Sequence, residues 1–126
     1  MSTTITLPKN TPIVTFCGVA SRFMHSIKLT FIDDGKVVKV RKWYGNDRWG
    51  RIIGADDLFF EGDDVGSVTA KVKIMITKDR GESWLEMPYE ETGDYTDLHL
   101  IKRISVRERG DDHSDASVSF NYYLNI

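Results

Sequence analysis

The sequence predicts an all-β protein, a two-sheet antiparallel β-sandwich of the jelly-roll kind with about eight strands. Residues 117–126 alternate strictly, and every second side chain from Val118 to Ile126 is apolar. Such alternation is typical of a strand that is buried on one face only. The pattern recurs along most of the chain between turn residues, and no stretch has a helical period. An up-and-down barrel or an open Greek-key barrel is the alternative architecture.

The first half of the chain predicts three strands and one long loop. Apolar alternation marks strands at 12–20 and 25–32, and Asp33-Asp34-Gly35-Lys36 predicts a tight hairpin turn, because Asp-Gly tolerates positive φ angles. Residues 37–44 return as the third strand. Residues 45–55 contain three glycines and no regular period, so we expect the longest loop there. Long loops of this kind often carry function.

The second half of the chain predicts five further strands. They are a short strand at 58–60, a long one at 67–77, a segment at 83–87 that pairs back onto it, and strands at 97–107 and 117–126. A polar excursion at 88–96 separates the last two from the rest. The side chains expected to face the core from 67–77 and 97–107 are Val68, Ala70, Val72, Ile74, Ile76, Leu98, Leu100, Ile104 and Val106.

Composition narrows the class of protein. The 126 residues predict a single domain, 1–126, and 17 Lys and Arg against 19 Asp and Glu give a net charge of -2. This balance argues against a nucleic-acid partner or an anionic membrane surface, and the chain has no apolar run of membrane-spanning length. Cys17 is the single cysteine, so we expect no intrachain disulfide. The start lacks the pattern of a signal peptide, which predicts cytoplasmic synthesis, with any release by a non-classical route.

Residues 77–84, Thr-Lys-Asp-Arg-Gly-Glu-Ser-Trp, fit the pattern Ser/Thr-x-Asp-x-Gly-x-Thr/Ser-Trp at every specified position. We expect a hairpin turn in which Asp79 accepts hydrogen bonds from backbone amides and Gly81 supplies an unusual backbone angle. The segment resembles the Asp-box that is repeated in sialidase propellers. One isolated box in a chain of this length favours a structural role.

Acidic residues concentrate in two turns, Asp63-Asp64 and 111–115. Closely spaced carboxylates in a loop can bind Ca²⁺, and solvated turn residues give the same sequence pattern. The candidates for metal binding in the second turn are Asp111, Asp112 and Asp115. The histidines at 25, 99 and 113 have neither zinc-site spacing nor a paired nucleophile, so we do not expect an enzyme.

Aromatic and hydrogen-bonding side chains gather around the predicted loop. The candidate ligand-binding residues are Trp43, Asn46, Asp47, Arg48 and Trp49, with Tyr44 between them. Aromatic faces can bury the apolar side of a sugar ring, while amide, carboxylate and guanidinium groups bind its hydroxyls. The alternative is that the same aromatics plug one end of the sandwich.

Three segments, 12–21, 66–74 and 107–126, resemble in order the small galactophilic bacterial lectins of the LecA type. Gly18-Val19-Ala20-Ser21 is similar to that family's Gly-Trp-Ala-Ser corner, and the chain ends in Asn-Ile as the family's closing strand does. The resemblance implies a jelly-roll sandwich that binds calcium, with the metal binding sugar hydroxyls directly. It assigns a backbone carbonyl to Arg22 and further metal ligands to Asp111 and Asp115.

Two functions follow as hypotheses. The first is a non-enzymatic, lectin-like carbohydrate-binding module with a glycan or small saccharide as partner and calcium as its implied cofactor. The second is a protein-binding or oligomeric assembly module, in which the exposed aromatics of the 43–60 region, such as Trp43, Trp49 and Phe59, anchor a partner or a second copy.

Overall fold

A computed structural model of the chain describes residues 3–62, 66–87, 89–95, 101–108 and 116–124. In these ranges the regular structure is entirely β. The eight strands are β1 (Thr3–Pro8), β2 (Ile13–Asp33), β3 (Lys36–Leu58), β4 (Ser67–Thr77), β5 (Leu85–Glu86), β6 (Tyr89–Tyr95), β7 (Ile101–Glu108) and β8 (Ala116–Tyr123). All pairings between them are antiparallel.

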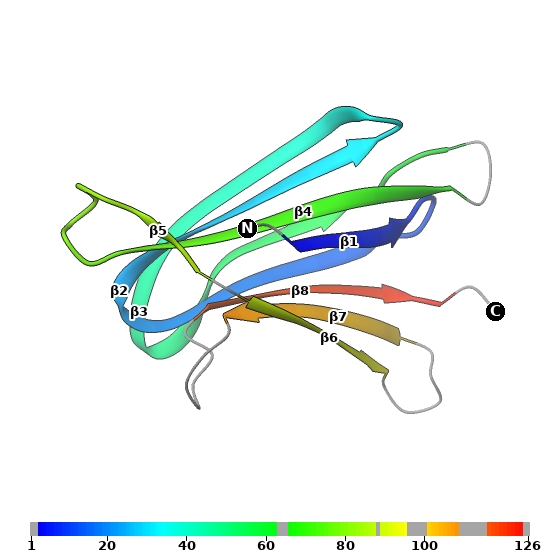
Figure 1. The fold of residues 1–126 in the computed structure, drawn as a ribbon. Coiled ribbons are helices and arrows are strands. Elements are labelled where there is room, and N and C mark those ends of the chain that lie inside the picture. Colours follow the sequence, from blue (N-terminus) through cyan, green and yellow to red (C-terminus); the bar gives the residue numbers. More distant parts are fainter. Residues whose placement is uncertain (1–2, 63–65, 88, 96–100, 109–115, 125–126) are drawn as a thin grey trace.

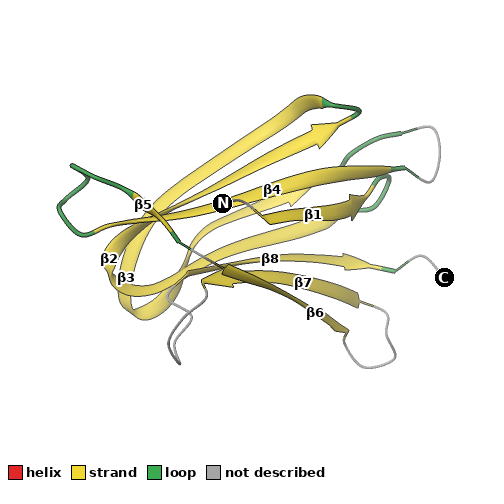
Figure 2. Cartoon of the chain, viewed as in Figure 1, coloured by secondary structure: helices red, strands yellow, loops and turns green. Residues whose placement is uncertain are grey.

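One hydrogen-bonded sheet folds over into two layers, because β2 and β3 run through both of them. The first half of β2, residues 13–19, pairs with β8, whereas residues 24–32 pair with β4. Strand β3 follows β2 along both halves. One layer therefore has the order β1-β4-β2-β3 and the other β6-β7-β8-β2-β3, as Figures 1 and 2 show. The predicted two-sheet antiparallel sandwich is confirmed.

A bulge in β2 makes the bend between the layers. Ser21 pairs with Asp47 and His25 pairs with Gly45, so residues 22–24 of β2 lie opposite Asn46 alone on β3. Extra residues on one strand bend it and increase its local twist. The bend brings residues 20–24 and 46–50 to the same end of the sandwich (Figure 1).

The core lies between the two layers and follows the predicted alternation. The inward side chains of β4 and β8 are buried, as are Ile104 and Val106 of β7. Phe31 sits at the centre, with its ring centroid 5.2 Å from that of Phe60 and 6.5 Å from that of Phe120. Phe31 belongs to the layer that contains β4, and Phe120 belongs to the layer that contains β8, so their contact joins the two layers. Burying a side chain of this size contributes about 1.5–3 kcal/mol.

The prediction of a loop at 45–55 was wrong, because these residues belong to β3. The glycines are needed for close packing between the two halves of that strand. A Cβ on Gly54 would lie 2.4 Å from Trp43, and one on Gly45 would lie 2.5 Å from Ile53. Trp43 and Ile53 thus pack against the core at the open edge of the sandwich. The ion pair of Arg41 with Asp56, 2.8 Å between Nε and Oδ2, closes the same edge.

Other boundaries also differ from the prediction. The segments 12–20 and 25–32 form one continuous strand, and 58–60 is the end of β3 followed by irregular chain. The polar segment 88–96 contains β6, and β1 has no predicted counterpart. The hairpin turn at Asp34 and Gly35 is confirmed by φ angles of 51° and 75°, and so is the pairing of β5 with β4.

Candidate functional site

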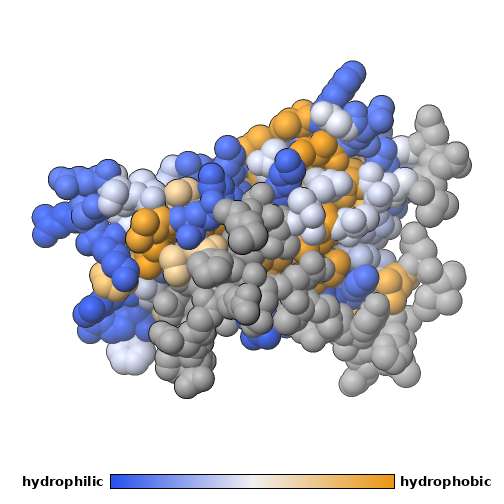
Figure 3. Space-filling model, viewed as in Figure 1, coloured by the Kyte–Doolittle hydropathy of each residue, from blue (hydrophilic) through white to orange (hydrophobic). Residues whose placement is uncertain are grey.

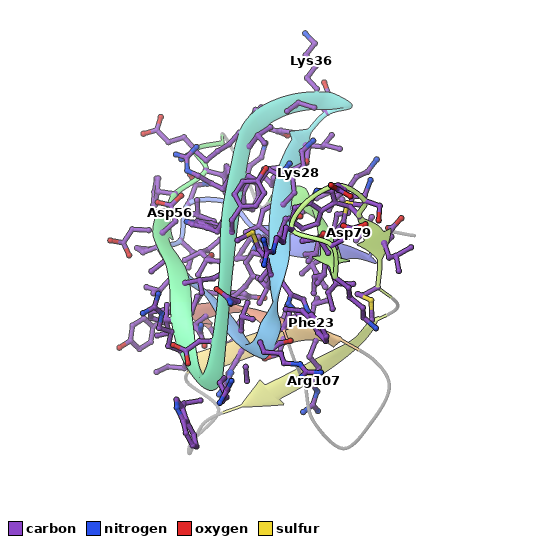
Figure 4. All side chains as sticks on the ribbon, turned by 90° about the vertical axis from the view of Figure 1, so that its left-hand side faces the viewer. Phe23, Lys28, Lys36, Asp56, Asp79 and Arg107 are labelled. Atoms are coloured by element: carbon purple, nitrogen blue, oxygen red, sulfur yellow. The ribbon has the colours of Figure 1, made fainter. Side chains whose placement is uncertain are left out.

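A cleft of about 300 Å³ opens at the bent end of the molecule. Three separate segments form it: the bulge of β2, Asn46 of the facing strand β3, and the start of the turn after β4. Its lining residues are Arg22, Phe23, Met24, Asn46, Thr77, Lys78 and Arg80. Figure 4 looks onto this end, with Phe23 and Asp79 labelled on it and Lys36 at the far tip of the β2–β3 hairpin.

Phe23 is the aromatic centre of the cleft. The guanidinium carbon of Arg22 lies 5.0 Å from the ring centroid, and Nζ of Lys78 lies 5.3 Å from it. Both distances are within the range of cation–π contacts. The bulge itself is fixed locally, because the Phe23 amide donates to Oγ of Ser21 at 3.1 Å and the Phe23 carbonyl is 3.0 Å from Nδ1 of the buried His25.

Asn46 connects β3 to the bulge. Its Nδ2 donates to the carbonyl of Arg22 at 3.2 Å. The neighbouring Asp47 is occupied within β3, since its Oδ1 accepts from the amide of Trp49 at 2.9 Å and its Oδ2 lies 3.4 Å from Nε of Arg51. The Asn46 hydrogen bond therefore ties β3 to the bulge, while the Asp47 contacts fix the neighbouring part of β3.

The turn after β4 forms the other wall. Oδ1 of Asp79 accepts from Oγ1 of Thr77 and from the amide of Ser83, both at 2.8 Å, and Oδ2 accepts from Oγ of Ser83. The amide of Gly81, whose φ is 89°, donates to Oγ1 of Thr77. Hydrogen bonds from Ser83 and Thr77 lower the pKa of Asp79 to about 2. Asp79 and Gly81 therefore have the roles that the sequence predicts for them.

The turn is also tied to β3 by an aromatic contact. The rings of Trp84 and Tyr44 meet edge to face, with centroids 6.0 Å apart, a favoured geometry for aromatic pairs. Nζ of Lys42 lies 5.1 Å from the Tyr44 ring centroid. Hydrophilic side chains gather at the end where the 77–84 turn projects (Figure 3).

The structure separates the five predicted ligand residues. Asn46 lines the cleft, whereas Trp43 packs against the core, which is the alternative position that the sequence leaves open for it. Asp47 is paired with Arg51. Arg48 and Trp49 are exposed on β3, and Trp49 keeps 89% of its surface in solvent.

Sequence reasoning missed Phe23, Lys78 and Arg80 as cleft residues. The available signal was the break in alternation at Phe23-Met24, between two segments that otherwise alternate cleanly. Lys78 and Arg80 gave a weaker signal, because they occupy unspecified positions of the Asp-box pattern. Only the fold shows that this turn lies against the β2 bulge.

The predicted metal ligands fall mostly outside the described residues. Asp111, Asp112 and Asp115 lie there, as do the Asp63-Asp64 turn, Leu98, Leu100, His99 and His113. Arg22 is described, and its carbonyl accepts from Asn46. Among the described residues no group of three or more His, Cys, Asp or Glu side chains is placed to hold a metal ion.

The architecture defines a class of protein, the two-layer antiparallel β-sandwich, and known structures share this fold. A high-affinity mannose-binding lectin of Ralstonia solanacearum matches with a TM-score of 0.65 and 16% identity, over 97% of this chain and 96% of that one. The Chromobacterium violaceum lectin CV2L, solved with alpha-methyl-fucoside, has a TM-score of 0.66 and 15% identity, over 97% and 96% of the two chains. The C-terminal domain of the lectin BC2L-C from Burkholderia cenocepacia has a TM-score of 0.66 and 16% identity, over 99% and 100%.

These three matches show that the chain has the same fold as these bacterial lectins, as the sequence predicts for its lectin-like architecture. The LecA family itself stays a prediction, since the names of two of the matching proteins mention mannose and fucoside. No protein-family model and no curated protein sequence matches the chain. Across the described ranges, no helix is long and apolar enough to cross a membrane.

Proposed function

We propose that the protein is a non-enzymatic, carbohydrate-binding lectin. The observation that carries this proposal is the likeness to three bacterial lectins over nearly the whole of both chains. Because sequence identity to them is only 15–16%, the ligand has to be argued from the cleft itself.

The cleft has the side-chain chemistry of a sugar site. Phe23 and Met24 offer apolar surface, and Met24 is 43% exposed. Asn46 uses its Nδ2 on the Arg22 carbonyl, which leaves its amide oxygen as an acceptor for a hydroxyl. Arg22 and Lys78 add charged donors. A small number of polar groups around an apolar surface is the usual composition of a small-ligand site.

The proposal includes the prediction that sugar binding depends on calcium, and the experiment below tests this dependence. The described residues supply the Arg22 carbonyl and no gathered carboxylates, while Asp111, Asp112 and Asp115 lie outside them. We therefore assign sugar contacts to the side chains of the cleft and none to a metal ion. A bound calcium ion would supply direct coordination of sugar hydroxyls.

A glycan array, probed with the whole chain in calcium and again in a chelator, tests the function. We expect hits that include mannose- or fucose-terminated glycans, and loss of those hits in Phe23→Ala. Phe59→Ala is the matched control, because Phe59 is 51% exposed and outside the cleft. An array with no hits under either condition would count against a lectin.

A second candidate function, an assembly or protein-binding module, is favoured by the 89% exposure of Trp49 together with 59% exposure of Ile52 on the same strand. Exposed apolar groups of this size often mark interaction sites. Trp43 is not available as an anchor, because it packs against the core. Trp49→Ser should then reduce self-association, measured by size-exclusion chromatography over a concentration series, and unchanged elution would argue against this role.

A further inference from the structure

We propose that the cleft between the β2 bulge and the 77–84 turn binds the acidic group of a saccharide, a carboxylate or a sulfate. This inference rests on the proposed lectin function and names its ligand class. The juxtaposition that carries it is three cationic side chains, Arg22, Lys78 and Arg80, that line one cleft of about 300 Å³ together with the Phe23 ring.

The cationic groups come from distant parts of the sequence, and the fold gathers them. Arg22 belongs to β2, whereas Lys78 and Arg80 belong to the turn after β4. In the described parts of the chain, none of the three has a carboxylate within ion-pair distance. Their charges are therefore available to a ligand.

The neighbouring carboxylates do not neutralise the cleft by direct contact. Asp79 stands between Lys78 and Arg80 in sequence, but its oxygens accept hydrogen bonds from Thr77 and Ser83 inside the turn. Asp47 follows Asn46 and is paired with Arg51 at 3.4 Å. Even with Asp79 counted as a full negative charge, the cationic charge of the lining is in excess.

The placement of the cations suits an oxyanion next to a sugar ring. Arg22 and Lys78 both lie near the Phe23 ring, at 5.0 and 5.3 Å from its centroid. Like charges repel each other, so gathering them opposes folding unless an anion or another partner compensates. A guanidinium group binds a planar or tetrahedral oxyanion through two parallel hydrogen bonds, and an ammonium group adds a point charge.

The size of the cleft and the total charge favour a saccharide over a polyanion such as nucleic acid. A volume of about 300 Å³ is at the lower end of the range for small-ligand sites, which suits a terminal sugar unit. The chain as a whole carries a net charge of -2, and a polyanion would experience that whole charge. A single acidic sugar is affected mainly by the excess positive charge of the cleft lining.

Isothermal titration of the whole chain with mannose, mannuronate and mannose 6-sulfate tests the inference, because these three sugars share a ring and differ at carbon 6. We expect the two acidic sugars to bind about tenfold more tightly than mannose, the ratio that charge-assisted hydrogen bonds give. Raising the salt concentration should weaken only the acidic sugars, because salt screens charge. A preference between carboxylate and sulfate identifies which group the cleft takes.

Variants locate the binding. Arg22→Gln and Lys78→Gln should each reduce the affinity for the acidic sugar about tenfold and reduce the affinity for mannose by a smaller factor. Lys36→Gln is the matched control, since it removes the same charge at the far tip of the β2–β3 hairpin (Figure 4). Unfolding midpoints of all three variants are measured alongside.

Three results would overturn the inference. The first is mannose binding as tightly as its acidic derivatives, which leaves the lectin function standing. The second is an equal effect of Lys78→Gln and Lys36→Gln on the affinity for the acidic sugar, and the third is a lower unfolding midpoint of the cleft variants with unchanged sugar affinity. If no glycan binds on the array, the proposed function itself fails.

Discussion

Asp79 shows how much one side chain can organise. Its carboxylate accepts from the side chains of Thr77 and Ser83 and from one backbone amide, although it lies at the surface. These donors favour the ionised form and lower its pKa from 3.8 to about 2. The turn that forms one wall of the cleft is thereby maintained by a negative charge.

Replacing Asp79 with Asn should make the folded state less stable at pH 7 and less sensitive to acid. In the parent protein Asp79 stays ionised in the folded state down to a pH of about 2, whereas the unfolded chain takes up the proton near its ordinary pKa. The stabilisation is therefore complete above about pH 4 and is lost as the pH falls toward 2. Urea unfolding midpoints at pH 7, 4 and 2.5 measure this difference.

Asp34→Asn is the control for that experiment, because Asp34 lies in the exposed hairpin turn at the other end of the molecule. It should keep the acid sensitivity of the parent protein. Equal acid sensitivity of Asp79→Asn and the parent protein would contradict the role of this carboxylate.

At the scale of single residues, the sequence predicts roles that depend on near neighbours. The positions of Asp79, Gly81 and Ser83 in the turn follow from a pattern of eight consecutive residues, and so their roles could be predicted. Phe23 could not be assigned in this way, because its importance depends on Lys78, more than fifty residues away.

At the scale of strands, β3 explains the main difference between prediction and structure. Its glycines and mixed polarity indicate a loop when only the sequence is considered. In the structure it is an edge strand in both layers, and its two halves face each other across the open side of the sandwich. Gly54 is required there because the Trp43 ring occupies the space of a side chain. By contrast, β4 and β8 are predictable, since one face of each is fully apolar.

Gly54→Ala should lower the free energy of unfolding by about 2 kcal/mol, the usual cost of inserting a methyl group into a packed region. The new Cβ would lie 2.4 Å from Cγ of Trp43, so the ring must move. Circular dichroism during urea unfolding measures the change.

Gly18→Ala provides a comparison on the partner strand, because its added Cβ would lie 3.5 Å from the carbonyl oxygen of Arg51, an ordinary contact. We expect a smaller loss of stability for this variant. A loss for Gly54→Ala no larger than that for Gly18→Ala would show that Trp43 can move without cost.

For the whole molecule, the two layers depend on the aromatic group of Phe31, Phe60 and Phe120. Phe120→Ala should reduce the free energy of unfolding by about 4 kcal/mol, because the ring is fully buried and its removal leaves a cavity in the core. Phe16→Ala is the matched control on the outer face, where the ring is 38% exposed, and it should cost about 1 kcal/mol. Similar losses for the two variants in urea unfolding would place the core elsewhere.

The overall architecture was predictable from the alternation, since one-sided strands require a second layer to cover their apolar faces. The cleft was predictable only in part. Asn46 was among the predicted ligand residues, but the cleft forms where the β2 bulge, Asn46 of β3 and the 77–84 turn meet. Which turns lie together depends on how β2 bends, and local patterns do not specify that bend.

The passage of β2 and β3 through both layers also affects how the molecule loses its structure. Neither layer can detach while the other persists, because the same two strands would have to be extended in one and disordered in the other. We therefore expect one cooperative transition, with the slowest amide hydrogen exchange in the two halves of β2 that are paired on both sides, residues 13–19 and 25–32. We expect the amides of β1 to exchange earlier, because β1 is an outer strand that pairs with β4 on one side.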